Sequence, residues 1–133
     1  ADDNSAAAVS FTTTERGRRR MAHTNARTTT LSAGQAVEMQ PGIVRTTMSY
    51  TDEVMLCHFA LLKGAVIALH QHAAAQTGFV MQGSVRLFSA DGGHCVVEAG
   101  GGYAFGPNEP HGAEALEDTC LIECFSPMRS EYL

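Results

Sequence analysis

The chain has 133 residues, which is enough for one domain built around a single hydrophobic core. Hydrophobic residues make up 44%, close to the average of globular proteins, and no apolar run is long enough to cross a bilayer. The formal net charge is −5 at pH 7, and residues 34–133 hold the acidic excess. We therefore expect neither a nucleic-acid partner nor a membrane partner for this part of the chain.

Residues 1–33 differ in composition from the rest of the sequence. They are rich in Ala, Thr, Ser and Arg, and they show neither a helical stripe nor clear alternation. We predict an N-terminal extension or arm over residues 1–33 and one domain over residues 34–133. The basic run Arg16–Arg20 is interpreted as a solvated tail, with a nucleic-acid or membrane contact as the less favoured alternative.

From about Gln40 the chain alternates short apolar segments with polar turns. Strands are predicted over residues 43–50, 54–62, 65–72, 77–82, 85–88, 94–98, 103–105, 111–116 and 119–125. The sequence Asp91-Gly92-Gly93 is a strong hairpin signal between two of these strands. Many short strands without a good helix predict an all-β sandwich or jelly roll, which we place at about Gln40 to Phe125.

The four cysteines form no CxxC pair. Cys120 and Cys124 are predicted to share one strand, which puts them roughly 13 Å apart and too far for a disulfide. No signal peptide is recognisable, because the segment Ala6 to Phe11 is too short. These observations favour reduced, buried thiols in a cytoplasmic protein.

Two histidines separated by one residue are the first candidate for chemistry. If residues 65–72 form a strand, His70 and His72 point to the same side, in line with Val66 and Ala68. Two imidazoles one strand step apart can bind one metal ion, and the side-chain oxygen of Gln76 is a neutral ligand nearby. An HxH pair is often incidental, so this pair alone does not establish a metal site.

A carboxylate in the last predicted strand is the second candidate. Alternation puts Leu121, Glu123 and Phe125 on one face, so Glu123 lies between two apolar side chains. Because burying a lone charge is costly, Glu123 is either paired, for instance with Arg129 or Arg86, or functional. Both interpretations stay open on these residues alone. Tyr103 and Phe105 are expected to be core aromatics, and His58 to be a core or pocket-lining group.

The spacing of these residues resembles the two motifs of the cupin family. The first motif is Gly64-x5-His70-x-His72-x3-Gln76-x6-Gly83, where x stands for any residue. The second motif is Gly100-x5-Gly106-x-Asn108-x2-His111. Here Gln76 stands where Glu is usual, Gly106 where Pro is usual and Asn108 where Gly is usual. The resemblance implies a single-domain jelly-roll barrel with one divalent metal ion on four ligands: His70, His72, Gln76 and His111.

The C-terminal stretch from Pro110 to Leu133 resembles that of the KdgF-type pectin-degradation cupins. Those proteins also carry Gln as the fourth ligand, and they present an acid, an aromatic residue and an arginine that match Glu123, Phe125 and Arg129. The departures are Glu123, where Asp is usual, and the small residues 73–75. The resemblance implies catalytic roles for Glu123 and Arg129 and substrate binding by Phe125 and Arg129.

The resemblance implies an isomerase-type enzyme that opens the ring of 4,5-unsaturated uronate monosaccharides. The alternatives are a non-catalytic sugar-binding cupin and another metal-cupin enzyme, such as a dioxygenase or polyketide cyclase. Zn, Ni, Fe, Mn and Co all suit the predicted ligands. A cupin of this size is expected to form a homodimer, because the edge strands of an open jelly roll need cover, and residues 1–33 could cross to the partner.

Overall fold

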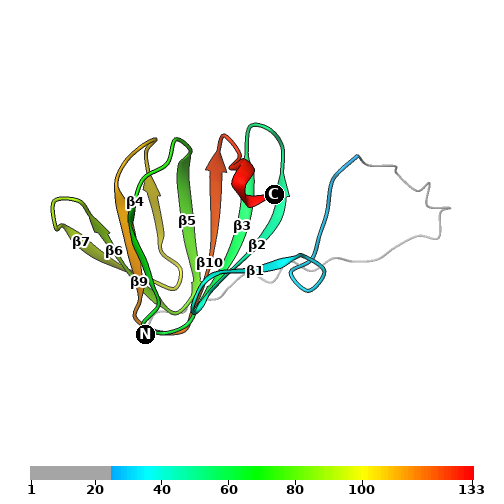
Figure 1. The fold of residues 1–133 in the computed structure, drawn as a ribbon. Coiled ribbons are helices and arrows are strands. Elements are labelled where there is room, and N and C mark those ends of the chain that lie inside the picture. The colour runs from blue at the N-terminus through cyan, green and yellow to red at the C-terminus, as the bar shows by residue number, and fades with distance from the viewer. Residues whose placement is uncertain (1–24) are drawn as a thin grey trace, which may run out of the picture.

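The structure is a computed structural model that describes residues 25–133 (Figure 1). The basic run Arg16–Arg20 and most of the predicted arm lie outside the described residues. Within them the chain forms ten strands and one 3₁₀ turn. These are β1 (Ala36–Gln40), β2 (Ile43–Tyr50), β3 (Met55–Leu61), β4 (Val66–His70), β5 (Ala75–Gln82), β6 (Ser84–Ser89), β7 (His94–Glu98), β8 (Gly102–Phe105), β9 (His111–Ala115), β10 (Thr119–Ser126) and η1 (Ser130–Tyr132).

The strands form two antiparallel sheets. One has the order β1-β2-β3-β10-β5-β8 and the other the order β4-β9-β6-β7. Figure 1 shows the four-stranded sheet beside the six-stranded one, with β1 as the edge strand that follows the N-terminal segment. The predicted all-β jelly roll is therefore confirmed. It begins earlier than Gln40, because β1 pairs with β2 and adds an edge strand that weak alternation had hidden.

Period-two alternation builds the core between the sheets. Along β3 every second residue is buried, and Met55, Cys57, Phe59 and Leu61 are all at most 4% exposed. They pack with Leu121 and with residues of the opposite sheet. A second cluster, around Val80 and Val85, joins β5 to β6 and β9.

The strand predicted over residues 65–72 is shorter and less regular than expected. It ends at His70, and its pairing with β9 shifts register between Ile67 and His70. Ile67 packs on the core whereas Val66 is 48% exposed, so His70 does not share a face with Val66. Such a register shift changes which side chains face inward. Because the strand ends at His70, strand alternation does not extend to His72 and does not explain why the two histidines converge.

Turn geometry explains some of the glycines in the sequence motifs. Gly83, between β5 and β6, has φ +88°, and a Cβ there would lie 2.4 Å from the carbonyl oxygen of Asp118. Only glycine fits such a position without strain.

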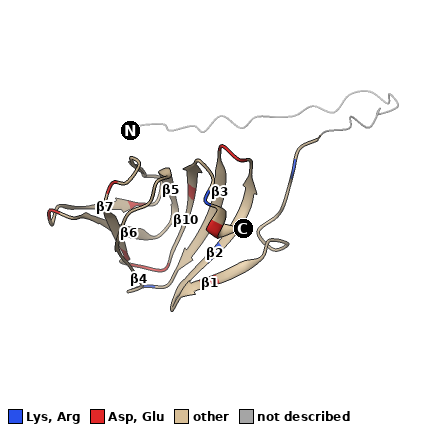
Figure 2. Cartoon of the chain, turned by 45° about the horizontal axis from the view of Figure 1, so that its top comes forward, with Lys and Arg blue, Asp and Glu red and all other residues tan. Residues whose placement is uncertain are grey.

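Figure 2 shows acidic residues in several turns, including the turn between β2 and β3. Among residues 25–133, no helix is long and apolar enough to cross a membrane.

The cysteines are all free, as predicted, but their burial is not uniform. Cys57 is buried, Cys120 and Cys124 are partly buried on β10, and Cys95 is exposed on β7. The expectation that all four thiols are buried is therefore wrong. The reason is topological: β7 is an edge strand, and the outward positions of β10 face away from the core.

Candidate metal centre and active site

A cavity of about 360 Å³ lies between the two sheets. Its walls combine apolar side chains with a few polar groups, which is typical of small-molecule sites. The polar groups among its lining residues are Gln40, His70, Gln76, Tyr103, His111, Glu123, Arg129 and Tyr132. Residues from both halves of the sequence therefore meet in one pocket.

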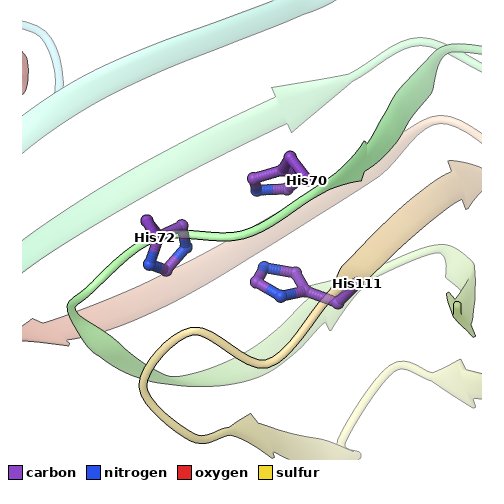
Figure 3. A group of neighbouring side chains, drawn as sticks. All are labelled: His70, His72 and His111. Atoms are coloured by element: carbon purple, nitrogen blue, oxygen red, sulfur yellow. The ribbon is translucent and has the colours of Figure 1, made fainter.

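Three histidines converge on one another (Figure 3), and two of them, His70 and His111, line this cavity. His70 at the end of β4 is the register partner of His111 at the start of β9, and their ring centroids lie 4.4 Å apart. His72 lies just beyond β4, with its ring 5.1 Å from that of His111. One ring nitrogen from each histidine lies within 4.8 Å of the other two. This spacing would let all three bind a single metal ion.

Backbone carbonyl groups orient all three rings. The Nδ1 atoms of His70, His72 and His111 lie 2.8, 2.7 and 2.7 Å from the carbonyl oxygens of Ala68, Ala74 and Glu109. Because a carbonyl oxygen only accepts, each Nδ1 carries a proton, and in the neutral form of the ring the lone pair is then on Nε2. This is the arrangement that metal-binding histidines need.

The histidine rings are also chemically suited to hold a cation. His111 is 4% exposed, and its Nε2 atom is buried with no hydrogen-bond partner among the described residues. Phe105 stacks on its ring at 4.3 Å, nearly parallel. Burial lowers the pKa of His72 and of His111, which favours the neutral, ligating form. A metal ion would satisfy the unpartnered nitrogen, so the residues fit this cofactor.

Gln76 completes the set of four residues expected from the motif. Its side chain on β5 is 7% exposed, and its Oε1 atom lies 2.8 Å from His72 Nε2. Its Nε2 atom points the other way and donates to Glu123 Oε1 at 3.2 Å. The structure therefore brings His70, His72, Gln76 and His111 together, with the amide oxygen on the side of the imidazoles.

The two motifs are tied to each other through the backbone. The amide of Asn108 donates to the carbonyl oxygen of His72 at 2.8 Å. Asn108 has φ 57°, in the left-handed region that asparagine tolerates better than most residues. This explains how Asn replaces the usual Gly in the second motif, and why the turn still delivers His111 next to His72.

Glu123 lines the cavity between Leu121 and Phe125, on the inward face of β10 that alternation predicted. The hydroxyl of Tyr103 donates to its Oε1 atom at 2.6 Å. Burial raises the pKa of Glu123 to about 7, although this hydrogen bond and the charge of Arg129 act in the opposite direction. Within residues 25–133, the two ion pairs are Arg86–Glu114 and Arg129–Glu131. Glu123 takes part in neither of them, so its pairing with Arg129 or Arg86 is not seen.

Arg129 lies at the same cavity, immediately before the C-terminal turn η1. Its Nε donates to Glu131 at 2.8 Å, and its guanidinium lies 4.1 Å from the ring centroid of Tyr132. The guanidinium of Arg45 lies 4.0 Å from the same centroid. The ring of Tyr132 therefore contacts both guanidinium groups through cation–π interactions. The buried Tyr132 thus fixes the place of Arg129.

Two predicted residues lie elsewhere than expected. Phe125 is 0% exposed and packs in the core, 5.9 Å from the ring of His72 and 5.2 Å from the guanidinium of Arg129. We therefore place Phe125 behind the cavity wall, where it supports both residues. His58 alternates with the buried Cys57 and Phe59, so it faces the outer side of the sheet and not the pocket.

Tyr103 is the polar group that sequence reasoning missed. It was expected to be a core aromatic, and its ring does pack on the second core cluster. Its hydroxyl nevertheless contacts Glu123, which lies two strands away in the same sheet. No local spacing reveals this contact, because β8 and β10 are separated by β5 in space and by a further strand in sequence.

Comparison with known proteins places this geometry in a family. The model of the cupin domain matches residues 57–124, which include both motifs. The chain belongs to the cupin family. It is 32% identical over 98 residues to the pectin degradation protein KdgF of Dickeya dadantii, covering 72% of this chain and 88% of that protein.

Two solved cupin structures resemble the fold closely. KdgF from a Halomonas species superimposes with a TM-score of 0.76 at 29% identity, over 81% of this chain and 99% of that chain. An RmlC-like cupin from Shewanella frigidimarina has the same TM-score at 25% identity, over 81% of this chain and 96% of that chain. The predicted resemblance to cupins, and to KdgF among them, is confirmed.

Proposed function

We propose that this protein is a metal-dependent enzyme of pectin degradation that converts 4,5-unsaturated uronate monosaccharides into linear keto-deoxyuronates. The observation that carries the proposal is a cluster of three imidazoles, two of which line the cavity, close to a partly buried carboxylate and a guanidinium that line the same cavity. The 32% identity to the pectin degradation protein KdgF supports the substrate class.

The reaction needs no oxidant or reductant. Opening the hemiacetal breaks the bond between C1 and the ring oxygen and transfers the proton of the C1 hydroxyl to that oxygen, which leaves an aldehyde at C1 and an enol hydroxyl on the former ring oxygen. The enol then loses its hydroxyl proton and gains one at carbon, which gives the ketone. A site for this conversion must bind an anionic sugar and move protons.

His70, His72, Gln76 and His111 are the residues that would hold the metal ion. A bound divalent ion supplies Lewis-acid polarisation of substrate oxygens. Because all four of these ligands are neutral, they leave the positive charge of the ion undiminished toward an anionic sugar.

Glu123 is the group that we assign to proton transfer. Its carboxylate lines the cavity, and its side chain is held by Tyr103 and Gln76 rather than by a cation. A carboxyl group in such a partly desolvated position can both accept and return a proton. We assign no proton transfer to His58, because its strand position faces away from the cavity.

Arg129 is the residue that we assign to the substrate carboxylate. Glu131 engages its Nε, and among the described residues no hydrogen bond occupies its two Nη groups. These groups can bind a carboxylate through charge-assisted hydrogen bonds. The ring of Tyr132 beneath the guanidinium limits its freedom, so little order would be lost on binding.

The decisive experiment mixes the purified protein with unsaturated monouronate freshly released by a lyase. Loss of the absorbance of the conjugated double bond is followed against the spontaneous rate, with chelator-treated protein as control. The proposal expects a marked acceleration that chelation removes and added metal restores. If the sugar binds without acceleration, the protein is a non-catalytic sugar-binding cupin. Uptake of oxygen during turnover would indicate a dioxygenase instead.

We also propose that the chain forms a homodimer through the outer face of β3, β10 and β5. Ile122 lies at its centre, beside His58 and Phe79, and both Phe79 and Met81 are over 40% exposed. The outward positions of these three strands carry no Lys, Arg, Asp or Glu. A face without charge can oppose its own copy without repulsion.

Light scattering at micromolar concentration tests this assembly. The expected mass is that of a dimer, and Phe79→Glu should give a monomer that keeps its fold. A monomer mass for the wild type would contradict the proposal. Whether residues 1–33 cross to the partner stays a prediction, because residues 1–24 lie outside the described part of the chain.

A further inference from the structure

Glu123, Gly78 and Tyr103 lie in register on three neighbouring strands, and Tyr103 reaches Glu123 across Gly78. Gly78 on β5 is the pairing partner both of Glu123 on β10 and of Tyr103 on β8. A Cβ on Gly78 would lie 2.2 Å from Cζ of Tyr103 and 2.5 Å from its hydroxyl oxygen. The phenol ring therefore crosses over the glycine to reach Glu123. A side chain at residue 78 would occupy the space that the Tyr103 ring fills.

Hydrogen bonds link Tyr103 through Glu123 to Gln76, which lies beside the histidines. Tyr103 donates to Glu123 Oε1 at 2.6 Å, and the same oxygen accepts from Gln76 Nε2 at 3.2 Å. With its nitrogen held by Glu123, the Gln76 amide presents Oε1 to the imidazoles, 2.8 Å from His72 Nε2. Burial, together with the charge of Glu123, raises the pKa of Tyr103, so its hydroxyl remains a donor at neutral pH.

We propose that Tyr103 is a positioning residue for the metal centre, because it holds Glu123 and Glu123 in turn aims the amide oxygen of Gln76. An amide without this partner can rotate and present its NH₂ group, which cannot bind a cation. Outer partners of metal ligands typically change metal affinity by about 10- to 100-fold. Tyr103 would therefore raise the metal affinity of the site without binding the metal itself. This inference rests on the metal site of the proposed function but not on its substrate.

The test measures Co²⁺ binding by chelator competition, together with the visible absorption spectrum of the Co²⁺-loaded protein. Tyr103→Phe removes the hydroxyl and keeps the ring, and we expect about 10-fold weaker binding and an altered spectrum. Gly78→Ala leaves the Tyr103 side chain chemically intact but displaces its ring and hydroxyl by steric clash, and the same two changes are expected. Tyr50→Phe and Gly102→Ala are matched controls, because Tyr50 is exposed and a Cβ on Gly102 meets its nearest atom at 3.4 Å.

A double-mutant cycle separates positioning from general destabilisation. In a Gln76→Ala background there is no amide to aim, so adding Tyr103→Phe should weaken Co²⁺ binding no further. Equal loss in both backgrounds would overturn the inference, as would wild-type binding by Tyr103→Phe and Gly78→Ala. None of these measurements uses the sugar, so a failure of the proposed reaction would be seen separately.

Discussion

The two ends of the cavity are held in place in different ways. At the histidine end, backbone carbonyl groups accept from Nδ1 of His70, His72 and His111, so the fold itself orients the rings. At the other end, side chains position one another: Tyr103 donates a hydrogen bond to Glu123, and the ring of Tyr132 contacts the guanidinium of Arg129. The orientation of the three imidazoles should therefore tolerate side-chain changes around them, whereas Gln76, Glu123 and Arg129 depend on particular residues brought from separate strands.

The largest effect is expected where a ligand itself is lost. His72→Ala should reduce the bound metal from about one ion per chain to near zero, because three neutral ligands with one open position bind far more weakly. Elemental analysis after dialysis measures this directly. His94→Ala is the matched control, since His94 is exposed on β7. Full metal retention by His72→Ala would mean that the histidines are structural.

The next largest effect is expected at the carboxylate. Glu123→Gln keeps the shape and an oxygen that can accept from Tyr103 and Gln76, but it cannot exchange a proton with the substrate. We expect metal content to survive and turnover of unsaturated uronate to fall by about 10²–10⁴-fold, the usual contribution of general acid–base catalysis. Steady-state kinetics on metal-loaded protein measure this. Unchanged turnover would remove Glu123 from the mechanism while leaving the metal site intact.

A smaller effect, mainly on substrate binding, is expected at the guanidinium. Arg129→Ala removes charge-assisted hydrogen bonds worth roughly 1.5–3 kcal/mol, so KM should rise by about 10- to 100-fold. Arg86→Ala is the control, because Arg86 belongs to an exposed ion pair with Glu114 outside the cavity. An equal change in both variants would show that Arg129 acts only through the overall charge of the protein.

The smallest effect is expected from the exposed partner of Arg129. Glu131 is 56% exposed in its side chain, and surface ion pairs contribute about 0–1 kcal/mol. Glu131→Gln should therefore change KM by less than about fivefold. Tyr132→Leu removes the ring that the guanidinium groups of Arg45 and Arg129 both contact, and it should change KM more. The reverse order would show that the ion pair, and not the aromatic ring, positions Arg129.

Local pattern was sufficient for most of the strands, since period-two alternation directly reflects which face of a sheet is buried. It failed at β4, because the register shifts between Ile67 and His70 and the strand ends at His70, and no local pattern in the sequence indicates either. It also missed β1, whose five residues are all exposed and therefore carry no burial pattern. Irregular and edge strands are set by their partners, and those partners lie elsewhere in the chain.

Alternation along the chain was enough to predict the all-β fold class and the inward position of Glu123. The set His70, His72, Gln76 and His111 was predicted only through the resemblance to the cupin motifs. The contacts that hold these side chains are visible only in the folded chain. Folding paired His70 with His111, placed Phe125 behind the wall and brought Tyr103 to Glu123 across Gly78. Such contacts depend on which strands become neighbours in a sheet. That order arises from packing the whole core, and no local stretch of sequence encodes it.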